Sequence, residues 1–173
     1  MSRFGRFLVV CGLAGLACPL PLPPAAAGDA AKGAVAPGQV RIQNVEVVLS
    51  PVGPVVLLKV EKRAIPVFVD AIVAESIRSA LTGKKPRRPL THDLMHAVLE
   101  GFDGRVTQVV VTLKDGTYYA ALTVTLRKTV KIFDSRSSDA IALAIHARAP
   151  ILVSQELLDS AGVELEKPDP RML

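Results

Sequence analysis

The order of its hydrophobic patterns constrains the fold of this chain more than any other feature. Three short runs rich in Val, Leu and Ile come first (RIQNVEVVLS, PVVLLKV and AIPVFV), and DAIVAESIRSALTG follows with apolar residues at helical spacing. The order returns later, where RVTQVVVTL, TYYAALTVTL and TVKIFD precede AIALAIHA. Such runs predict strands and the helical spacing predicts helices. We therefore expect an α/β fold of the mixed α+β type: a single compact domain with two similar halves, each of three strands followed by helices.

The expected helices carry signals at their ends. The first runs from Asp70, which can cap it, to Gly83, which stops it; the second begins at a Thr91 cap, and Ser137 or Ser138 caps the helix of the second half. A short strand, PILV, and a helix, SQELLDSAG, complete the domain. The apolar residues at helical spacing in the first helix are Ile72, Val73, Ile77, Ala80 and Leu81. The face of the second helix that is expected in the core consists of Leu94, Met95, Val98 and Leu99.

Residues 1–27 have the features of a secretory signal peptide. Arg3 and Arg6 precede an apolar run, and small residues extend to Ala27, after which we expect cleavage. Prolines interrupt the apolar run, which is shorter than the roughly 20 residues that a bilayer requires, so no stable membrane span is expected. The protein is therefore expected to be exported, either to the periplasm or to the extracellular space. A lipoprotein anchored at Cys18 is the alternative.

Removal of this leader changes what the composition implies. Cys11 and Cys18 both lie inside it, so the mature chain would have no disulfide and no thiolate metal site. The formal charge would fall from +5 to +3 with the loss of two arginines, which is weak evidence for a polyanionic partner. We expect residues 28–40 to form a flexible linker, residues 41–165 the domain, and residues 166–173 a C-terminal tail.

The stretch DSRSSDAIALAIH, residues 134–146, places two carboxylates and an arginine at the start of a helix. When AESIRSAL of the first half is aligned with SDAIALAI of the second, Glu75 matches Asp139. Each would then lie in the first turns of equivalent helices, where unpaired amides and the helix dipole favour an anion. The simpler interpretation is that both helices have acidic residues near their amino ends and that Asp134 and Arg136 form an internal salt bridge.

Three stretches in a fixed order resemble the bifunctional nuclease (BFN) domain family: VAESIRSALTGKKPRRPLTHDL, LKDGTYYAAL and DSRSSDAIALAI. The similarity extends from Lys62 to Gly162. It implies a compact mixed α/β domain that self-associates as a homo-oligomer such as a dimer, with nuclease activity on RNA and DNA. Ser135 and Ser137 replace the alanine and proline that are usual in the last motif of the family. The residues that fit this motif are Asp134, Arg136, Ser138 and Asp139.

Hydrolysis of a phosphodiester requires a nucleophile, neutralisation of the phosphate charge and usually hard cations held by carboxylates. His92 is a candidate general base or ligand, and Arg136 can grip a phosphate through two hydrogen bonds. The other candidate catalytic residues are Asp93, Asp134 and Asp139. Glu75 and Asp139 are the expected ligands of a divalent metal, Mg²⁺ or Mn²⁺. Each residue also has a structural interpretation, as a helix-end charge, an ion pair or a backbone contact.

A basic segment precedes His92 and could hold the backbone of RNA or DNA. Its residues are Lys84, Lys85, Arg87 and Arg88. A solvated loop is the alternative interpretation. Only Tyr118 and Tyr119 supply aromatic rings near a turn, so stacking of bases is not indicated and binding should be tolerant of sequence.

Other functions have less support or remain open. His92 and His96 have the spacing of a zinc peptidase helix, but Asp93 stands where that motif requires glutamate. The chain has no GxSxG motif, P-loop or dinucleotide fingerprint, which leaves serine hydrolases, NTPases and dehydrogenases without support. The alternatives are a non-catalytic exported ligand- or protein-binding module on the same fold, and an oligomeric envelope component whose helix pair forms an interface.

Overall fold

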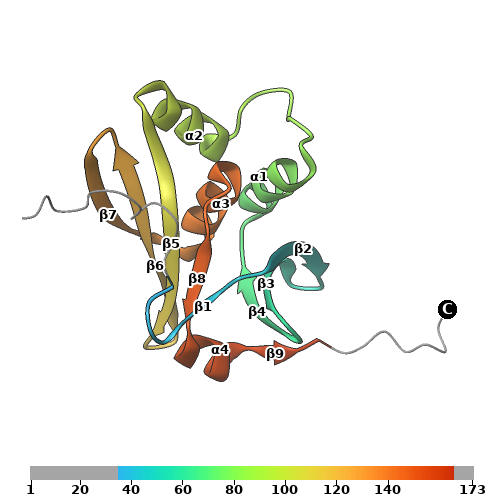
Figure 1. The fold of residues 1–173 in the computed structure, drawn as a ribbon. Coiled ribbons are helices and arrows are strands. Elements are labelled where there is room, and N and C mark those ends of the chain that lie inside the picture. The colour runs from blue at the N-terminus through green and yellow to red at the C-terminus, as the bar shows by residue number, and fades with distance from the viewer. Residues whose placement is uncertain (1–34, 166–173) are drawn as a thin grey trace, which may run out of the picture.

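Two antiparallel meanders, each followed by a helix, form most of residues 35–165, the part of the chain that the computed structural model describes (Figure 1). The first half contains β2 (Asn44–Ser50), β3 (Gly53–Val60), β4 (Arg63–Phe68) and α1 (Ala71–Thr82). The second half contains β5 (Gly104–Lys114), β6 (Thr117–Leu126), β7 (Thr129–Arg136) and α3 (Ser137–Ala147). The predicted mixed α+β class and the order of three strands and a helix are confirmed.

The remaining elements extend the two sheets and connect the halves. β1 (Gln39–Arg41) pairs with β8 (Ile151–Ser154), which runs parallel to β5, so the larger sheet has the order β1-β8-β5-β6-β7. β9 (Val163–Glu164) pairs with β4 at the edge of the smaller sheet, β2-β3-β4-β9. α2 (Thr91–Gly101) lies between the halves in sequence, and α4 (Gln155–Ala161) follows β8.

α3 is the central helix of the core. It packs against β5 and β6 on one side and contacts both α1 and α2 (Figure 1). All residues from Ala140 to Ala144 are buried. Three of these five are alanines, whose small side chains allow neighbouring elements to approach closely. Because the middle of α3 is enclosed, its amino end, with Arg136 and Asp139, is held at the junction of the sheet with the other two helices.

The turn between β5 and β6 follows directly from the sequence. Asp115 and Gly116 both have positive φ, 52° and 73°. A two-residue hairpin of this kind matches the twist of its strands, and Asp-Gly is among the pairs that adopt it most readily. The predicted turn at KDG is confirmed.

Two predicted helix caps are displaced by one residue. Leu90 occupies the N-cap position of α2 and Thr91 is its first helical residue; the Leu90 amide donates to Asp93 Oδ2 at 2.9 Å. Arg136 occupies the N-cap position of α3, and its guanidinium reaches Asp139 in the first turn. Asp93, in the third helical position, therefore caps α2 in place of Thr91, whereas at α3 the carboxylate of Asp139 binds the Arg136 guanidinium and no described side chain caps the backbone.

The apolar face predicted for α2 is largely wrong. Leu94, Met95 and Val98 are 58%, 44% and 48% exposed, and only Leu99 packs against the core. The cause is that α2 presents His92 and Leu99 to α3 and β5 and turns its broader apolar face outward. Of the apolar residues at helical spacing in α1, Val73 and Ile77 are buried, whereas Ile72 and Leu81 are exposed.

The predicted signal peptide and C-terminal tail lie outside the described residues and remain predictions. The same holds for most of the predicted linker, but Gln39 and Val40 belong to β1 and are ordered by pairing with Ser154 and Val153. No described helix combines the length and the apolar composition needed to cross a membrane.

Candidate active site

A pocket of about 900 Å³ lies where the amino ends of α1 and α3 meet α2, β6 and β7. Its volume is within the range of about 300–1,000 Å³ that is typical of ligand sites. Nine of its lining residues are apolar: Ala71, Ile72, Val73, Met95, Leu99, Leu122, Val124, Phe133 and Leu143. The others are polar: Asp70, Thr91, His92, Asp134, Ser135, Arg136 and Asp139. A mostly apolar cavity with a few polar groups has the general composition of a binding site.

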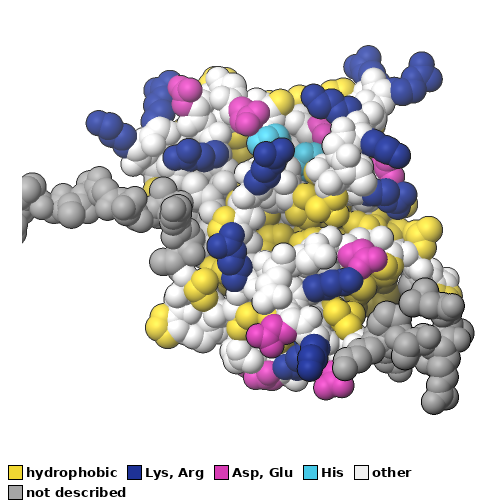
Figure 2. Space-filling model, turned by 45° about the vertical axis from the view of Figure 1, so that its right-hand side comes forward, with side chains coloured by type: hydrophobic (Ala, Val, Ile, Leu, Met, Phe, Trp, Pro, Cys, Tyr) yellow, Lys and Arg dark blue, Asp and Glu magenta, His cyan; other side chains and the backbone are white. Residues whose placement is uncertain are grey.

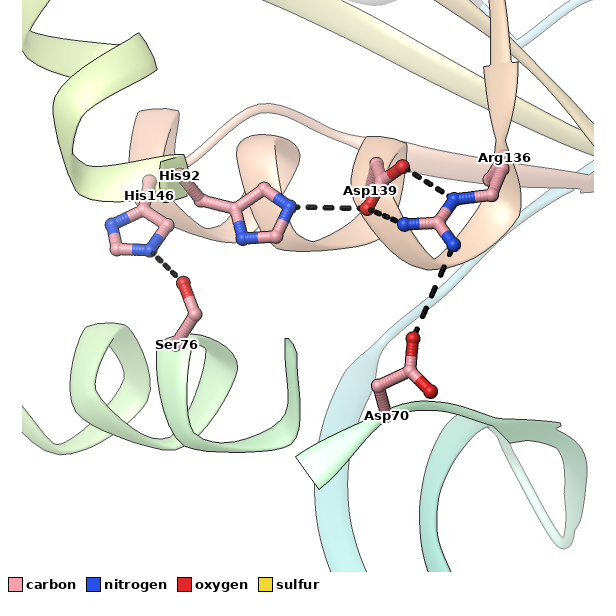
Figure 3. A network of polar contacts seen from close by, with 6 residues as sticks. All are labelled: Asp70, Ser76, His92, Arg136, Asp139 and His146. Carbon is pink, nitrogen blue, oxygen red and sulfur yellow. Dashed lines mark hydrogen bonds and ion pairs between the residues drawn. The ribbon is translucent and has the colours of Figure 1, made fainter. Parts of the chain in front are cut away.

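Asp139 is the centre of the polar group. Arg136 donates to it through two nitrogens, from Nε to Oδ2 at 2.8 Å and from an Nη to Oδ1 at 3.1 Å (Figure 3). His92 Nε2 contacts the same Oδ1 at 3.2 Å. Asp70 lies on the far side of Arg136, with 4.0 Å between its Oδ2 and Nη1 (Figure 3). Four side chains from three segments of the chain therefore converge at one end of α3.

The surroundings of Asp139 keep its carboxylate ionised. Partial burial alone would raise its pKa, but the hydrogen bonds from Arg136 and His92 outweigh burial and bring the pKa below the ordinary value. The same carboxylate raises the pKa of Arg136, which is charged in any case. The first turn of α3 adds a favourable dipole for the negative charge.

The orientation of His92 limits what this side chain can do. It is 6% exposed, and its Nε2 is engaged with Asp139. A carboxylate can only accept, so Nε2 carries the proton and donates it. The other ring nitrogen, Nδ1, is buried and has no hydrogen-bond partner among the described residues. In this arrangement His92 holds Asp139 and does not present a free nitrogen to a substrate.

A second polar cluster lies near the opposite end of α3. His146 Nε2 and Ser76 Oγ are 2.9 Å apart (Figure 3), and His146 Nδ1 is 3.7 Å from Asp93 Oδ1. Burial lowers the pKa of His146; Asp93 opposes this effect, and the charges of His96 and His92 add to it. Asp93, a predicted catalytic residue, therefore contacts His146 and caps α2, and it is absent from the lining of the large pocket.

The other predicted site residues are divided between the pocket and the surface. Asp134 borders the pocket but is exposed, and it forms no ion pair with any other described residue. Glu75 is exposed, lies 3.6 Å from Arg78 and is not a lining residue. It occupies the fifth position of α1, whereas Asp139 occupies the third position of α3, so the two are not equivalent.

The basic segment is exposed and separate from the large pocket. Lys84 and Lys85 line a smaller pocket of about 170 Å³ together with Asp93, His146 and Arg148, while Arg87 and Arg88 are exposed and line neither. On the face drawn in Figure 2, Lys and Arg side chains are scattered with Asp and Glu among them, and hydrophobic side chains gather across the middle. The positive charge on that face is dispersed and does not form one continuous patch.

The predicted metal ligands do not fit a resident ion. Among residues 35–165, no group of three or more His, Cys, Asp or Glu side chains is arranged to hold a metal. Both oxygens of Asp139 already accept hydrogen bonds from Arg136. The carboxylates that remain at the pocket are those of Asp70 and Asp134. Mg²⁺ often binds through one or two carboxylates together with water and a substrate phosphate, so these two fit such an ion in type and number.

Sequence reasoning missed three contributors to the two clusters and the pocket. The sequence indicates Asp70 only as a helix cap, and Ser76 is a small residue of α1 with no distinguishing pattern around it. Phe133 lay in a run identified only as a strand. Its neighbour across the sheet is Leu122, a buried residue of β6, and this pairing orients Phe133 toward the helices. The alternation of β7 groups Phe133 with Lys131 and Ser135 and not with the apolar Val130 and Ile132, so no local pattern indicates Phe133 or Ser76.

Comparison with known proteins identifies the family of this chain. The family model described as the bifunctional nuclease domain matches residues 55–166. Two curated relatives, "Uncharacterized protein MT1877" of Mycobacterium tuberculosis strain CDC 1551 / Oshkosh and "Uncharacterized protein Rv1829" of strain H37Rv, are each 32% identical over 129 residues. The match covers 73% of this chain and 77% of each relative. The family name indicates a nuclease-like function, and the chain belongs to the bifunctional nuclease domain family.

Proposed function

We propose that this chain, exported after removal of its leader, hydrolyses phosphodiester bonds of RNA and DNA in the large pocket. The observation that carries the proposal is the Arg136–Asp139–His92 group, which combines a phosphate-binding cation with an oriented carboxylate in a cavity of ligand size. Membership of the bifunctional nuclease domain family supports the same reaction class.

The contacts suggest a role for each side chain. Arg136 is 68% exposed, so its outer Nη atoms can bind a phosphate while the inner edge holds Asp139. Asp139 Oδ2, which among the described residues accepts only the hydrogen bond from Arg136 Nε, accepts a second from the attacking water and takes its proton as the new phosphorus–oxygen bond forms. The leaving oxygen receives a proton from solvent. His92 is a positioning residue that fixes the Asp139 carboxylate through Nε2.

The charge of the site gives a reason for the expected Mg²⁺ or Mn²⁺. Asp70, Asp134 and Asp139 outnumber Arg136, and a phosphodiester would add a further negative charge. A divalent cation bound with the substrate would supply charge neutralisation at the phosphate, with Asp70 and Asp134 as its protein ligands. Glu75 and Asp139 are not proposed as ligands.

The proposal is tested by incubating the purified chain with single-stranded RNA and with single- and double-stranded DNA, each with Mg²⁺, Mn²⁺ or a chelator. We expect metal-dependent cleavage that falls at least about tenfold in an Asp139→Asn variant purified in the same way. Equal cleavage by both proteins would contradict a catalytic role for Asp139, whether the activity comes from another site or from a contaminating nuclease, and cleavage by neither would contradict the nuclease proposal.

The second candidate is a non-catalytic binding module. It is favoured by the apolar lining of the pocket, which exceeds what hydrolysis of a phosphate requires. Saturable binding of nucleic acid or of a small molecule at this pocket, without cleavage under any metal condition, would support this candidate over the nuclease.

We expect the basic segment to contribute affinity without sequence preference. Replacing Lys84, Lys85, Arg87 and Arg88 by serine should weaken binding to all single strands alike, because contacts to phosphate release counterions without reading bases. The slope of log K against log salt should flatten by up to about 3, or roughly 0.7 for each lost contact. Filter binding at several salt concentrations measures this slope. An unchanged slope would identify the segment as a solvated loop.

Self-association is also part of the proposal, and the exposed apolar face of α2 is its expected interface. Leu94 and Val98 remain largely exposed although they lie on one helix face. A Leu94→Ser/Val98→Ser variant should raise the dimer dissociation constant at least about fivefold, as expected for loss of buried interface side chains. Sedimentation equilibrium measures it, and Leu49→Ser, at a similarly exposed position on β2, is the control. A parent chain that stays monomeric would contradict the expectation.

A further inference from the structure

We infer that the apolar wall of the large pocket receives one unstacked base of the nucleic acid, so that the protein acts on single strands in preference to duplexes. The inference rests on the proposed nuclease function and specifies its substrate class. The lining of the pocket is more apolar than the proposed reaction requires. Attack on a phosphate requires only the polar group around Asp139, yet more than half of the lining residues are apolar.

The apolar wall combines side chains of several elements of the fold, and part of it belongs to the core. Its side chains come from five elements, α1, α2, α3, β6 and β7, and four of them, Val73, Leu122, Val124 and Leu143, are buried core residues that the pocket reaches. A cavity with such a floor favours a ligand that is apolar on its faces. Every nucleobase has such faces, and the charged phosphate stays outside.

Phe133 supplies the aromatic ring of this wall that can stack on a base. It is 48% exposed, lines the pocket and lies three residues before Arg136 on β7. Side chains three residues apart on a strand leave opposite faces, but Arg136 stands at the end of β7 and both residues line this pocket, about 10 Å apart along the strand, so the aromatic ring and the phosphate-binding guanidinium can contact one nucleotide and its neighbour. Stacking on an aromatic ring is a common way for proteins to hold bases of single strands.

The geometry of a duplex is incompatible with this arrangement. Paired bases are stacked between their neighbours and expose only their edges, so none can enter a pocket without being extruded. A single strand offers its bases without that cost. Because the wall is made of carbon groups, it does not read hydrogen-bonding edges, and recognition should depend little on base identity.

The test uses single-stranded DNA that carries 2-aminopurine, whose fluorescence responds to stacking, the duplex of the same strand, and the same strand with an abasic position. We expect a fluorescence change and tight binding with the single strand, and at least about fivefold weaker binding with the duplex and the abasic strand, the lower end of what loss of one stacking contact produces. Phe133→Ala should weaken binding of the intact single strand by a similar factor and leave the abasic strand unaffected.

Phe68→Ala is the matched control, because Phe68 is an exposed phenylalanine on β4 that does not line the pocket. Equal binding and cleavage of single strand, duplex and abasic strand would overturn the base pocket but leave the nuclease intact. Base-dependent binding with no cleavage of any substrate would overturn the nuclease and leave the base pocket. If Phe133→Ala changes only the dimer dissociation constant, with no fluorescence response in the parent, the wall is covered by a second copy of the chain and the inference fails.

Discussion

Replacing His92 by leucine should lower the cleavage rate about tenfold, whereas replacing it by glutamine should leave the rate within about threefold of the parent. The reason is that His92 acts through Asp139: its Nε2 donates to Oδ1, and its other nitrogen is buried. A glutamine amide can supply the same donor, but leucine cannot. Loss of the donor leaves the carboxylate held only by Arg136, whose side chain is 68% exposed, so the two can shift together, and misplacement of a reacting group is costly for catalysis.

The pair of variants separates positioning from proton transfer. A general base at this position would be lost in both variants, and both rates would then fall by about 10²-fold or more. His96→Leu and His96→Gln serve as controls, because His96 lies on the same helix, contacts Glu100 and is not a lining residue. Initial rates, corrected for the folded fraction by circular dichroism, are the measurement. Equal, large losses in both His92 variants would contradict the positioning role.

Local periodicity was sufficient to predict most elements of this fold. Strands and helices of six or more residues carry their own pattern, and the Asp-Gly turn is a local signal. β1 and β9 have three and two residues, too few for any period, and they form only because β8 and β4 offer free edges. Their pairing is a property of the tertiary structure that no window of sequence contains.

The outward face of α2 could not be predicted for a related reason. Apolar residues at helical spacing indicate that a face will be covered, but they do not identify what covers it. In this chain α3 already fills the space beside the sheet, and α2 contributes little more than His92 and Leu99 to the interior. The surplus apolar face is the basis for the proposed self-association.

The candidate site was predictable where its residues are close in sequence. Arg136 and Asp139 are three residues apart at a helix start, a spacing that brings the side chains together. Glu75 was placed beside them because the halves were aligned by their residue patterns. In the structure, Glu75 is the fifth residue of α1 and Asp139 is the third residue of α3, so the alignment is wrong by two positions. Asp70, and not Glu75, is the residue that approaches Arg136. The contact of His92 with Asp139 spans 47 residues and depends on the packing of α2 on α3.

Replacing Asp139 by asparagine should lower cleavage at least about tenfold per folded molecule, or ~1.4 kcal/mol in the barrier, because the amide is nearly isosteric but cannot take a proton. Asp159→Asn is the control, since Asp159 also pairs with an arginine but lies on α4, away from the pocket. An Asp139→Asn protein that cleaves at the parent rate would show that the group is only a helix start.

Stability measured on the same preparations separates the catalytic role of Asp139 from its structural one. Its pKa is lowered from the ordinary 3.8, with the hydrogen bonds from Arg136 and His92 outweighing burial, so the ionised form stabilises the folded protein. This stabilisation is fully present above the unfolded pKa and is lost as pH falls through the lower folded pKa.

Loss of the charge at the helix start should cost about 0.3–1 kcal/mol at neutral pH. The Tm difference between parent and Asp139→Asn should therefore shrink below the ordinary carboxyl pKa and disappear only below the lowered pKa of the folded state, whereas a difference that persists there would reflect altered packing. A stability loss of this size leaves most molecules folded at assay temperature, so a tenfold loss of cleavage at neutral pH can be assigned to the missing proton acceptor.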